Sequence, residues 1–192
     1  MANLILFHSV LGLRPSIFRF ADKLREKGHI VYTPDLYFGE VFDDLEIANR
    51  KFSEIGISEM MSRSISVVQG LPTDSVYGGF SNGGASAELL ACTQSEAKGC
   101  LLFHSALPIN MLQIDQWPSK VPVQIHYSKN DPFRNDGFIA TLSESIKKSG
   151  SKVEYFEYEH GGHLFTDEDF RDYDQQSAQK LIKNVSWFLE SI

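Results

Sequence analysis

The chain has 192 residues, of which 42% are hydrophobic and 22% charged, and its 18 basic and 25 acidic side chains give a net charge of −7. This composition is typical of a soluble globular protein, and 14 glycines and 7 prolines are too few for a low-complexity or fibrous chain. Because an acidic chain offers no basic footprint to phosphates, the composition argues against a nucleic-acid partner.

The length predicts a single domain spanning residues 1–192. Two cysteines, Cys92 and Cys100, cannot form a disulfide scaffold or a four-ligand zinc site, so we expect reduced core residues. The first residues lack the basic start of a signal peptide, and no apolar run is long enough to cross a membrane. We therefore expect a cytoplasmic protein with no membrane partner, either a monomer or a small homo-oligomer.

Short apolar runs alternate with helical patterns along the chain. Residues 4–7 form a continuous apolar run, which is typical of a strand buried on both faces of a parallel sheet. The later strand patterns are short and bounded by turn residues. They fall at residues 30–32, 73–80, 99–104, 121–127 and 152–158.

Helical spacing of apolar residues separates these runs. The first pattern begins near Phe18 and ends at Gly28, and residues 45–68 carry a longer pattern in which Gly56 suggests two helices rather than one. Further helices are predicted at residues 82–92, 138–148 and 175–189. Parallel strands need crossover connections, so this alternation predicts an α/β fold: a doubly wound, mainly parallel sheet of about six strands with helices on both faces.

The strongest chemical signal is the segment Gly79-Phe80-Ser81-Asn82-Gly83-Gly84, which matches the pattern G-x-S-x-G between a predicted strand and a predicted helix. A tight strand-to-helix turn strains the backbone of its central residue and leaves no room for side chains two positions away. Such a turn exposes the serine hydroxyl beside free N–H groups at a helix N-terminus. Ser81 is therefore the candidate nucleophile.

A serine nucleophile needs a histidine base and an acid that orients the histidine. His163 follows the sixth predicted strand and Asp131 follows the fifth, so both are expected at the same sheet edge as Ser81, in the chain order serine, acid, histidine. His160 remains an alternative base. Asp136 and Asp115 remain alternative acids.

On this kind of sheet an oxyanion is held by two backbone N–H groups, which here would be those of Val10 and Asn82. His8 and His104 each end a strand near the proposed site and are candidates to shape it. No spacing such as H-E-x-x-H indicates a metal site, and no G-x-G-x-x-G follows the first strand. We therefore expect no metal and no cofactor.

With these features the chain resembles the dienelactone hydrolase family of the α/β-hydrolase superfamily. Five segments carry the resemblance, and together they span nearly the whole chain. They are His8-Ser9-Val10-Leu11-Gly12-Leu13, Tyr32-Thr33-Pro34-Asp35-Leu36-Tyr37, Gly79-Phe80-Ser81-Asn82-Gly83-Gly84, Asn130-Asp131-Pro132 and Gly162-His163-Leu164-Phe165. The resemblance implies a nearly capless α/β-hydrolase that cleaves ester or lactone bonds, with a triad of Ser81, Asp131 and His163.

The chain departs from the family pattern at two positions. Well-known members have a cysteine nucleophile where this chain has Ser81, and a glutamate in the first loop where this chain has Ser9. A hydroxyl is far less acidic than a thiol, so Ser81 must rely on general-base activation by His163. Arg14 and Arg50 are candidates for the family's arginines that bind a substrate carboxylate, as Ser9 is for substrate contact.

The sequence thus predicts a cofactor-free serine hydrolase for a small ester, lactone or thioester, acting through an acyl-enzyme. Two alternatives stay open at this point. The same triad can serve an acyltransferase, and the same fold can serve a non-catalytic binding protein.

Overall fold

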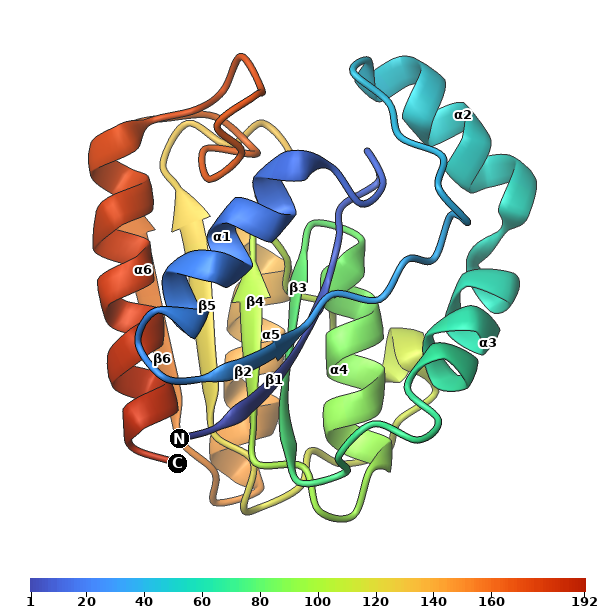
Figure 1. Cartoon of the computed structure of the whole chain (residues 1–192). Helices are drawn as coiled ribbons and strands as arrows, with labels where there is room; N and C mark the ends of the chain where they lie inside the picture. Colours follow the sequence, from blue (N-terminus) through green and yellow to red (C-terminus); the bar gives the residue numbers. More distant parts are fainter.

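The computed structural model describes residues 1–192 and contains one six-stranded sheet (Figure 1). Its strands are β1 (Asn3–Phe7), β2 (Ile30–Tyr32), β3 (Ser75–Phe80), β4 (Gly99–Phe103), β5 (Val123–Ser128) and β6 (Val153–Tyr158). They lie in the order β2-β1-β3-β4-β5-β6, and every neighbouring pair is parallel. The predicted six-stranded α/β fold is confirmed.

Helices cover both faces of the sheet, as predicted. The helices are α1 (Pro15–Arg25), α2 (Leu45–Ile55), α3 (Ile57–Val67), α4 (Gly83–Thr93), α5 (Asp136–Lys148) and α6 (Gln175–Glu190). Buried residues of α1 and α6 share one core cluster with the strands, and those of α3, α4 and α5 share the other. None of the helices combines the length and the apolar character that crossing a membrane would require.

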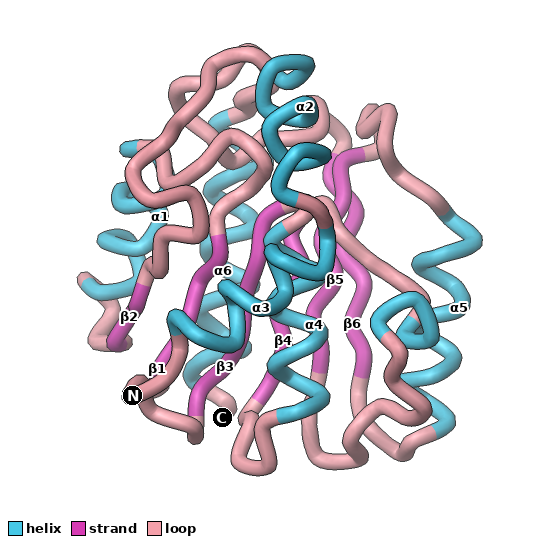
Figure 2. The backbone as a smooth tube through the Cα atoms, turned by 90° about the vertical axis from the view of Figure 1, so that its right-hand side faces the viewer, coloured by secondary structure: helices cyan, strands magenta, loops and turns pink.

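The segment that was expected to break into two helices does so at Gly56. This glycine has a φ of 83° and lies between the end of α2 and the start of α3. An L-residue with a side chain is strained at this φ, whereas glycine is not. Figure 2 shows α2 standing above the carboxyl ends of the strands, with α3 descending beside α4.

A short 3₁₀ helix, η1 (Ile109–Leu112), lies between β4 and β5 and was not predicted. Its four residues are too few to produce a periodic pattern in the sequence. Ile109 is buried in the core, whereas Met111 is exposed.

A small apolar cluster joins α2 to two loops that follow strands of the sheet. It consists of Val10, Leu11, Ala48, Leu164 and Phe170, all of them buried, and we call it the junction cluster. Its members come from the loop after β1, from α2, and from the loop between β6 and α6. Three segments that are distant in sequence are therefore packed against one another above the sheet.

Candidate active site

Ser81 lies on the sharp turn between β3 and α4, as its sequence motif predicted. Its φ of 52° is in the left-handed region, which is costly for a residue with a side chain. Two backbone hydrogen bonds hold this conformation: the Ser81 N–H donates to the carbonyl of Phe103 at 2.8 Å, and the Ser81 carbonyl accepts from the Gly84 N–H at 2.9 Å. The neighbouring strand and the first turn of α4 therefore fix the serine in place.

The glycines around Ser81 are there for steric reasons. A Cβ on Gly79 would lie 2.1 Å from the carbonyl oxygen of Gly83, and a Cβ on Gly83 would lie 2.4 Å from the carbonyl oxygen of His8. A Cβ on Gly84 would meet the Ser105 side chain at 2.3 Å. Real Cβ atoms do not approach other atoms so closely, so the turn can exist only with these side chains missing.

The structure brings Ser81, His163 and Asp131 together. The Nε2 atom of His163 lies 2.7 Å from Ser81 Oγ, and its Nδ1 atom lies 2.8 Å from Asp131 Oδ2 and 2.9 Å from Oδ1. Asp131 is 6% exposed and also accepts a hydrogen bond from the Phe133 N–H. The carboxylate therefore faces Nδ1, so the proton on the neutral imidazole belongs there and leaves Nε2 free to accept from the hydroxyl.

The loop that carries His163 is anchored on both sides. Ser128, the last residue of β5, donates its hydroxyl to the carbonyl of Gly161 at 2.6 Å. The Gly162 N–H donates to the carbonyl of Asp172, and a Cβ on Gly162 would clash with the Asp172 carboxylate. These contacts place the imidazole next to a serine that lies 82 residues earlier in the chain.

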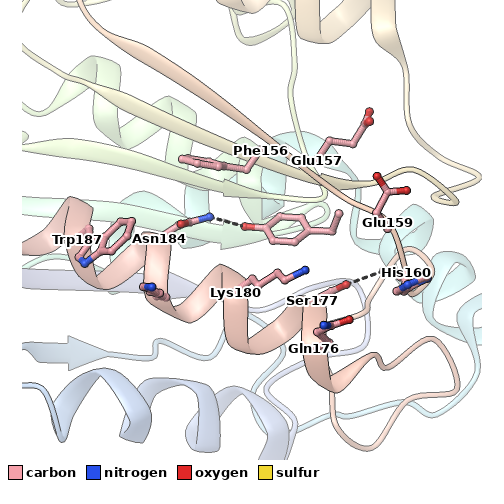
Figure 3. A pocket seen from close by; sticks show the side chains of 11 residues that line it. Phe156, Glu157, Glu159, His160, Gln176, Ser177, Lys180, Asn184 and Trp187 are labelled. Atoms are coloured by element: carbon pink, nitrogen blue, oxygen red, sulfur yellow. Dashed lines mark hydrogen bonds between the residues drawn. The ribbon is translucent and has the colours of Figure 1, made fainter.

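The alternative assignments do not reach the serine. His160 is exposed and lines a different cavity, of about 400 Å³, between β6 and α6 (Figure 3). Asp136 is exposed and pairs with Arg134, and Asp115 is exposed in the loop after η1. Among the candidate histidines and acids, only His163 and Asp131 form hydrogen bonds in a chain with Ser81.

Two backbone N–H groups at the Ser81 cavity have no hydrogen-bond acceptor within the protein. Neither the Val10 nor the Asn82 N–H donates a hydrogen bond to another protein atom, and both residues line the cavity into which Ser81 opens. Gly12 allows the first loop to pack closely against the segment before α2, because a Cβ on it would lie 2.3 Å from the carbonyl oxygen of Glu40. The two groups that the sequence predicted as oxyanion donors are therefore free to bind an oxygen atom.

The cavity has a volume of about 430 Å³. It is lined by residues of α2 and α3, by η1 and the segment that follows β4, and by Tyr127 of β5 and residues that come after that strand. Phe133 packs edge-on against the His163 ring with a centroid distance of 4.7 Å. These wall residues were missed by sequence reasoning, because apolar side chains on a cavity wall look like ordinary core residues.

Of the two candidate histidines that shape the site, only His104 lines the cavity. Its φ is 57°, its Nε2 atom lies 3.3 Å from the Thr166 hydroxyl, and burial lowers its pKa well below the ordinary value of 6.5, helped by His163 and His126. His8 instead donates from Nδ1 to the Ser9 carbonyl and accepts at Nε2 from the Leu36 N–H. His8 therefore stabilises the first loop by linking it to the backbone of Leu36.

Ser9 also serves the first loop rather than the cavity. Its hydroxyl accepts from the Leu11 N–H at 3.2 Å and the residue is 4% exposed. Neither Ser9, the candidate for substrate contact, nor His8, a candidate to shape the site, lines the cavity.

Arg14 and Arg50, the candidates for binding a substrate carboxylate, do not line the cavity either. Arg14 is 5% exposed, and its guanidinium is occupied by Asp167 at 3.0 Å, by Asp43 and by the carbonyl of Phe42. Arg50 is largely exposed on α2 and pairs with Glu46. One arginine is thus structural and the other is a solvated surface residue.

The arrangement can support nucleophilic chemistry. A hydroxyl that is hydrogen-bonded to a neutral imidazole can lose its proton as it attacks, and a buried carboxylate stabilises the imidazolium that forms. Two free N–H groups can donate hydrogen bonds to the negative charge that develops on a carbonyl oxygen and so stabilise it. No group of His, Cys, Asp or Glu side chains is arranged to hold a metal ion.

The fold is shared with solved structures of hydrolases. A dienelactone hydrolase-like promiscuous phosphotriesterase from metagenomic libraries superposes with a TM-score of 0.81 at 17% identity, covering 100% of this chain and 86% of that one. A thermophilic esterase of Thermogutta terrifontis with propionate bound superposes with a TM-score of 0.70 at 18% identity, covering 99% and 83%. At these identities the likeness establishes the fold.

Sequence comparison establishes the family. A protein of Aquifex aeolicus (strain VF5) named "Putative carboxymethylenebutenolidase" is 25% identical over 188 residues, which cover 91% of this chain and 81% of the relative. The sequence model of the dienelactone hydrolase family matches residues 2–192. Since that match includes every element of the sheet and the whole Ser81 site, the chain belongs to the dienelactone hydrolase family.

Proposed function

We propose that this enzyme cleaves small carboxylic ester, lactone or thioester bonds through an acyl-enzyme formed on Ser81. Membership of the dienelactone hydrolase family makes the chain a hydrolase of ester-type bonds. The proposal adds the nucleophile, its partners and the covalent intermediate. The observation that carries it is the chain of hydrogen bonds from Ser81 Oγ through His163 to Asp131, at 2.7 Å and 2.8 Å.

In the first half of the proposed reaction, Ser81 Oγ attacks the carbonyl carbon while its proton passes to His163 Nε2. The carbonyl oxygen becomes an oxyanion and accepts hydrogen bonds from the Val10 and Asn82 N–H groups. When the tetrahedral intermediate collapses, the bond to the leaving oxygen or sulfur breaks and the imidazolium protonates the leaving group. Asp131 remains ionised and stabilises the imidazolium.

In the second half, water takes the place of the leaving group. His163 accepts a proton from the water as its oxygen attacks the acyl carbon, and then returns a proton to Ser81 Oγ as the acid product leaves. The substrates we propose are small molecules, because the cavity of about 430 Å³ lies in the usual range for small-molecule sites.

The proposal is tested by replacing the serine. Ser81→Ala should lower kcat for p-nitrophenyl esters by about 10⁴-fold or more and should abolish labelling by a fluorophosphonate, with the thermal unfolding midpoint preserved. Labelling that persists at another residue, or turnover that survives the substitution, would reassign the nucleophile.

The role of the imidazole is tested with a matched pair of variants in the same loop. His163→Ala should remove both turnover and labelling, because no other side chain forms a hydrogen bond with Ser81 Oγ. His160→Ala should leave both nearly unchanged, because His160 lies in the other cavity. The opposite pattern would move the base from His163 to His160.

A further inference from the structure

We infer that the substrate of this site is electrically neutral and carries an apolar arm, and that a substrate with a carboxylate is a poor fit. This inference rests on the proposed function and specifies the substrate class of the same site. It concerns the walls of the cavity rather than the reacting groups.

The cavity walls carry no charge. Not one of the residues that line the cavity is Asp, Glu, Lys or Arg, and most are apolar. The polar members besides Ser81 and the two histidines are neutral amides and hydroxyls, among them Asn49, Ser105 and Asn135. A carboxylate that left water for such walls would lose its hydration and gain no ion pair, which is strongly unfavourable.

The arginines near the cavity are already paired. Arg63 of α3 pairs with Glu59, donates to the Leu36 carbonyl and lies over the ring of Phe38. Arg134, which follows Phe133, pairs with Asp136 and Glu157. Like Arg14 and Arg50, neither of them lines the cavity, so no arginine is placed to pair with a carboxylate bound there.

The largest exposed side chains of the cavity lining are apolar, and the exposed polar ones are the neutral amides of Asn49 and Asn135. Ile57 of α3, Met111 of η1 and Phe133 all line the cavity, and their exposed fractions are 65%, 57% and 58%. They come from three separate segments and line the same cavity, whereas isolated exposed apolar residues would be scattered. An apolar arm that enters the cavity would cover these side chains and remove their surface from water.

A matched pair of substrates tests the inference. The p-nitrophenyl ester of hexanoic acid and the mono-p-nitrophenyl ester of adipic acid share a six-carbon acyl chain and differ in a terminal methyl group or carboxylate. We expect kcat/KM to be at least about tenfold higher for the hexanoate. An equal or higher kcat/KM for the adipate ester would overturn the inference.

Chain length tests the apolar arm. In a series of p-nitrophenyl acylates from acetate to octanoate, or in a series of alkyl acetates, kcat/KM should rise by about fourfold per methylene until the cavity is full, the factor that corresponds to roughly 0.8 kcal/mol per buried CH₂. A flat dependence on length in both series would contradict it.

A pair of variants locates the effect in the cavity. Ile57→Arg places a cation at the mouth and should shift the ratio of kcat/KM towards the adipate ester by about fivefold, the upper range for an exposed ion pair. Ile47→Arg adds the same charge at an exposed position of α2 outside the cavity, and should leave the ratio within about twofold. Equal shifts in both variants would mean that net charge, and not the cavity, selects the substrate.

These outcomes are distinct from a failure of the proposed function. If Ser81 is not labelled and no ester is hydrolysed, the proposed function fails. If Ser81 is labelled and esters are hydrolysed with a preference for the carboxylate, only the inference about the substrate fails.

Discussion

At the residue scale, backbone strain is concentrated at the site. Four residues other than glycine have a positive φ, and two of them, Ser81 and His104, line the cavity. A left-handed conformation costs such residues about 1–2 kcal/mol each. The contacts around these residues must outweigh this cost. At Ser81 the contacts are possible only because the neighbouring positions are glycines, where a Cβ would clash with the backbone or with Ser105.

Gly83→Ala tests this dependence. The added methyl group would lie 2.4 Å from the His8 carbonyl oxygen and 2.9 Å from that of Phe7, so α4 would have to move away from β1. We expect a loss of at least about 2 kcal/mol in the free energy of unfolding, measured by urea denaturation, and a fall in esterase activity.

The matched control for that substitution is Gly137→Ala. Gly137 is also in the first turn of a helix, α5, but an added Cβ there would meet only the Asn135 side chain, at 3.2 Å. Its stability should change by less than about 1 kcal/mol. Similar losses in both variants would show that the crowding at Gly83 is not decisive.

The environment of Glu88 is expected to make the stability of the protein depend on pH. Glu88 is a fully buried acid on α4, two turns after Ser81, and its Oε1 atom accepts from the N–H of Leu107 at 3.0 Å. Burial raises its pKa to about 8 from 4.5, so the folded protein holds a proton that the unfolded chain releases. The stabilisation from Glu88 is therefore complete below pH 4.5 and is lost as the pH rises towards 8.

The free energy of unfolding should accordingly fall by up to about 1.4 kcal/mol per pH unit across the window between these two pKa values. Urea denaturation from pH 5 to 9 measures this slope. Glu88→Gln, which cannot lose a proton, should flatten it, and Glu96→Gln, at an exposed position, should leave it as in the wild type. Parallel curves for wild type and Glu88→Gln would contradict the prediction.

At the element scale, Arg14 connects the segments that build the site. From the start of α1 it bonds Asp167 and the Asp169 carbonyl in the loop after His163, and it bonds Asp43 and the Phe42 carbonyl just before α2. A single guanidinium thereby joins the loop that carries the histidine to the cavity wall.

Removing this guanidinium leaves Asp167, which is 6% exposed, without its partner. Arg14→Met should therefore lower the free energy of unfolding by about 3–5 kcal/mol, and the double variant Arg14→Met/Asp167→Leu should recover much of that loss. Thermal and urea unfolding measure both changes. Arg50→Ala, which breaks only the exposed pair with Glu46, should stay within about 0.5 kcal/mol of the wild type.

At the scale of the whole molecule, the sequence predicts what depends on local pattern. Continuous apolar runs such as residues 4–7 identify buried strands, and Gly56 identifies the break between α2 and α3. The G-x-S-x-G turn and the positions of Asp131 and His163 after their strands were readable too, because chain order and strand ends fix them to one edge of the sheet.

What the sequence could not supply depends on distant contacts. The sequence makes Arg14 a candidate for binding a substrate carboxylate, whereas in the structure Arg14 pairs with Asp167, 153 residues away. The order of the strands and the walls of the cavity likewise arise from packing between segments that are far apart along the chain. Apolar wall residues such as Phe52 and Met61 give no local signal that separates them from the core.

The junction cluster has a consequence for engineering this scaffold. Because Ala48 of α2 packs with Leu11 beside the predicted oxyanion loop and with Leu164 directly after His163, grafting α2 from a homologue would disturb reactivity together with selectivity. A graft meant to transfer substrate specificity would have to include the cluster residues on both neighbouring loops as well as α2. New selectivities in this scaffold are therefore expected to emerge through concerted changes in three segments.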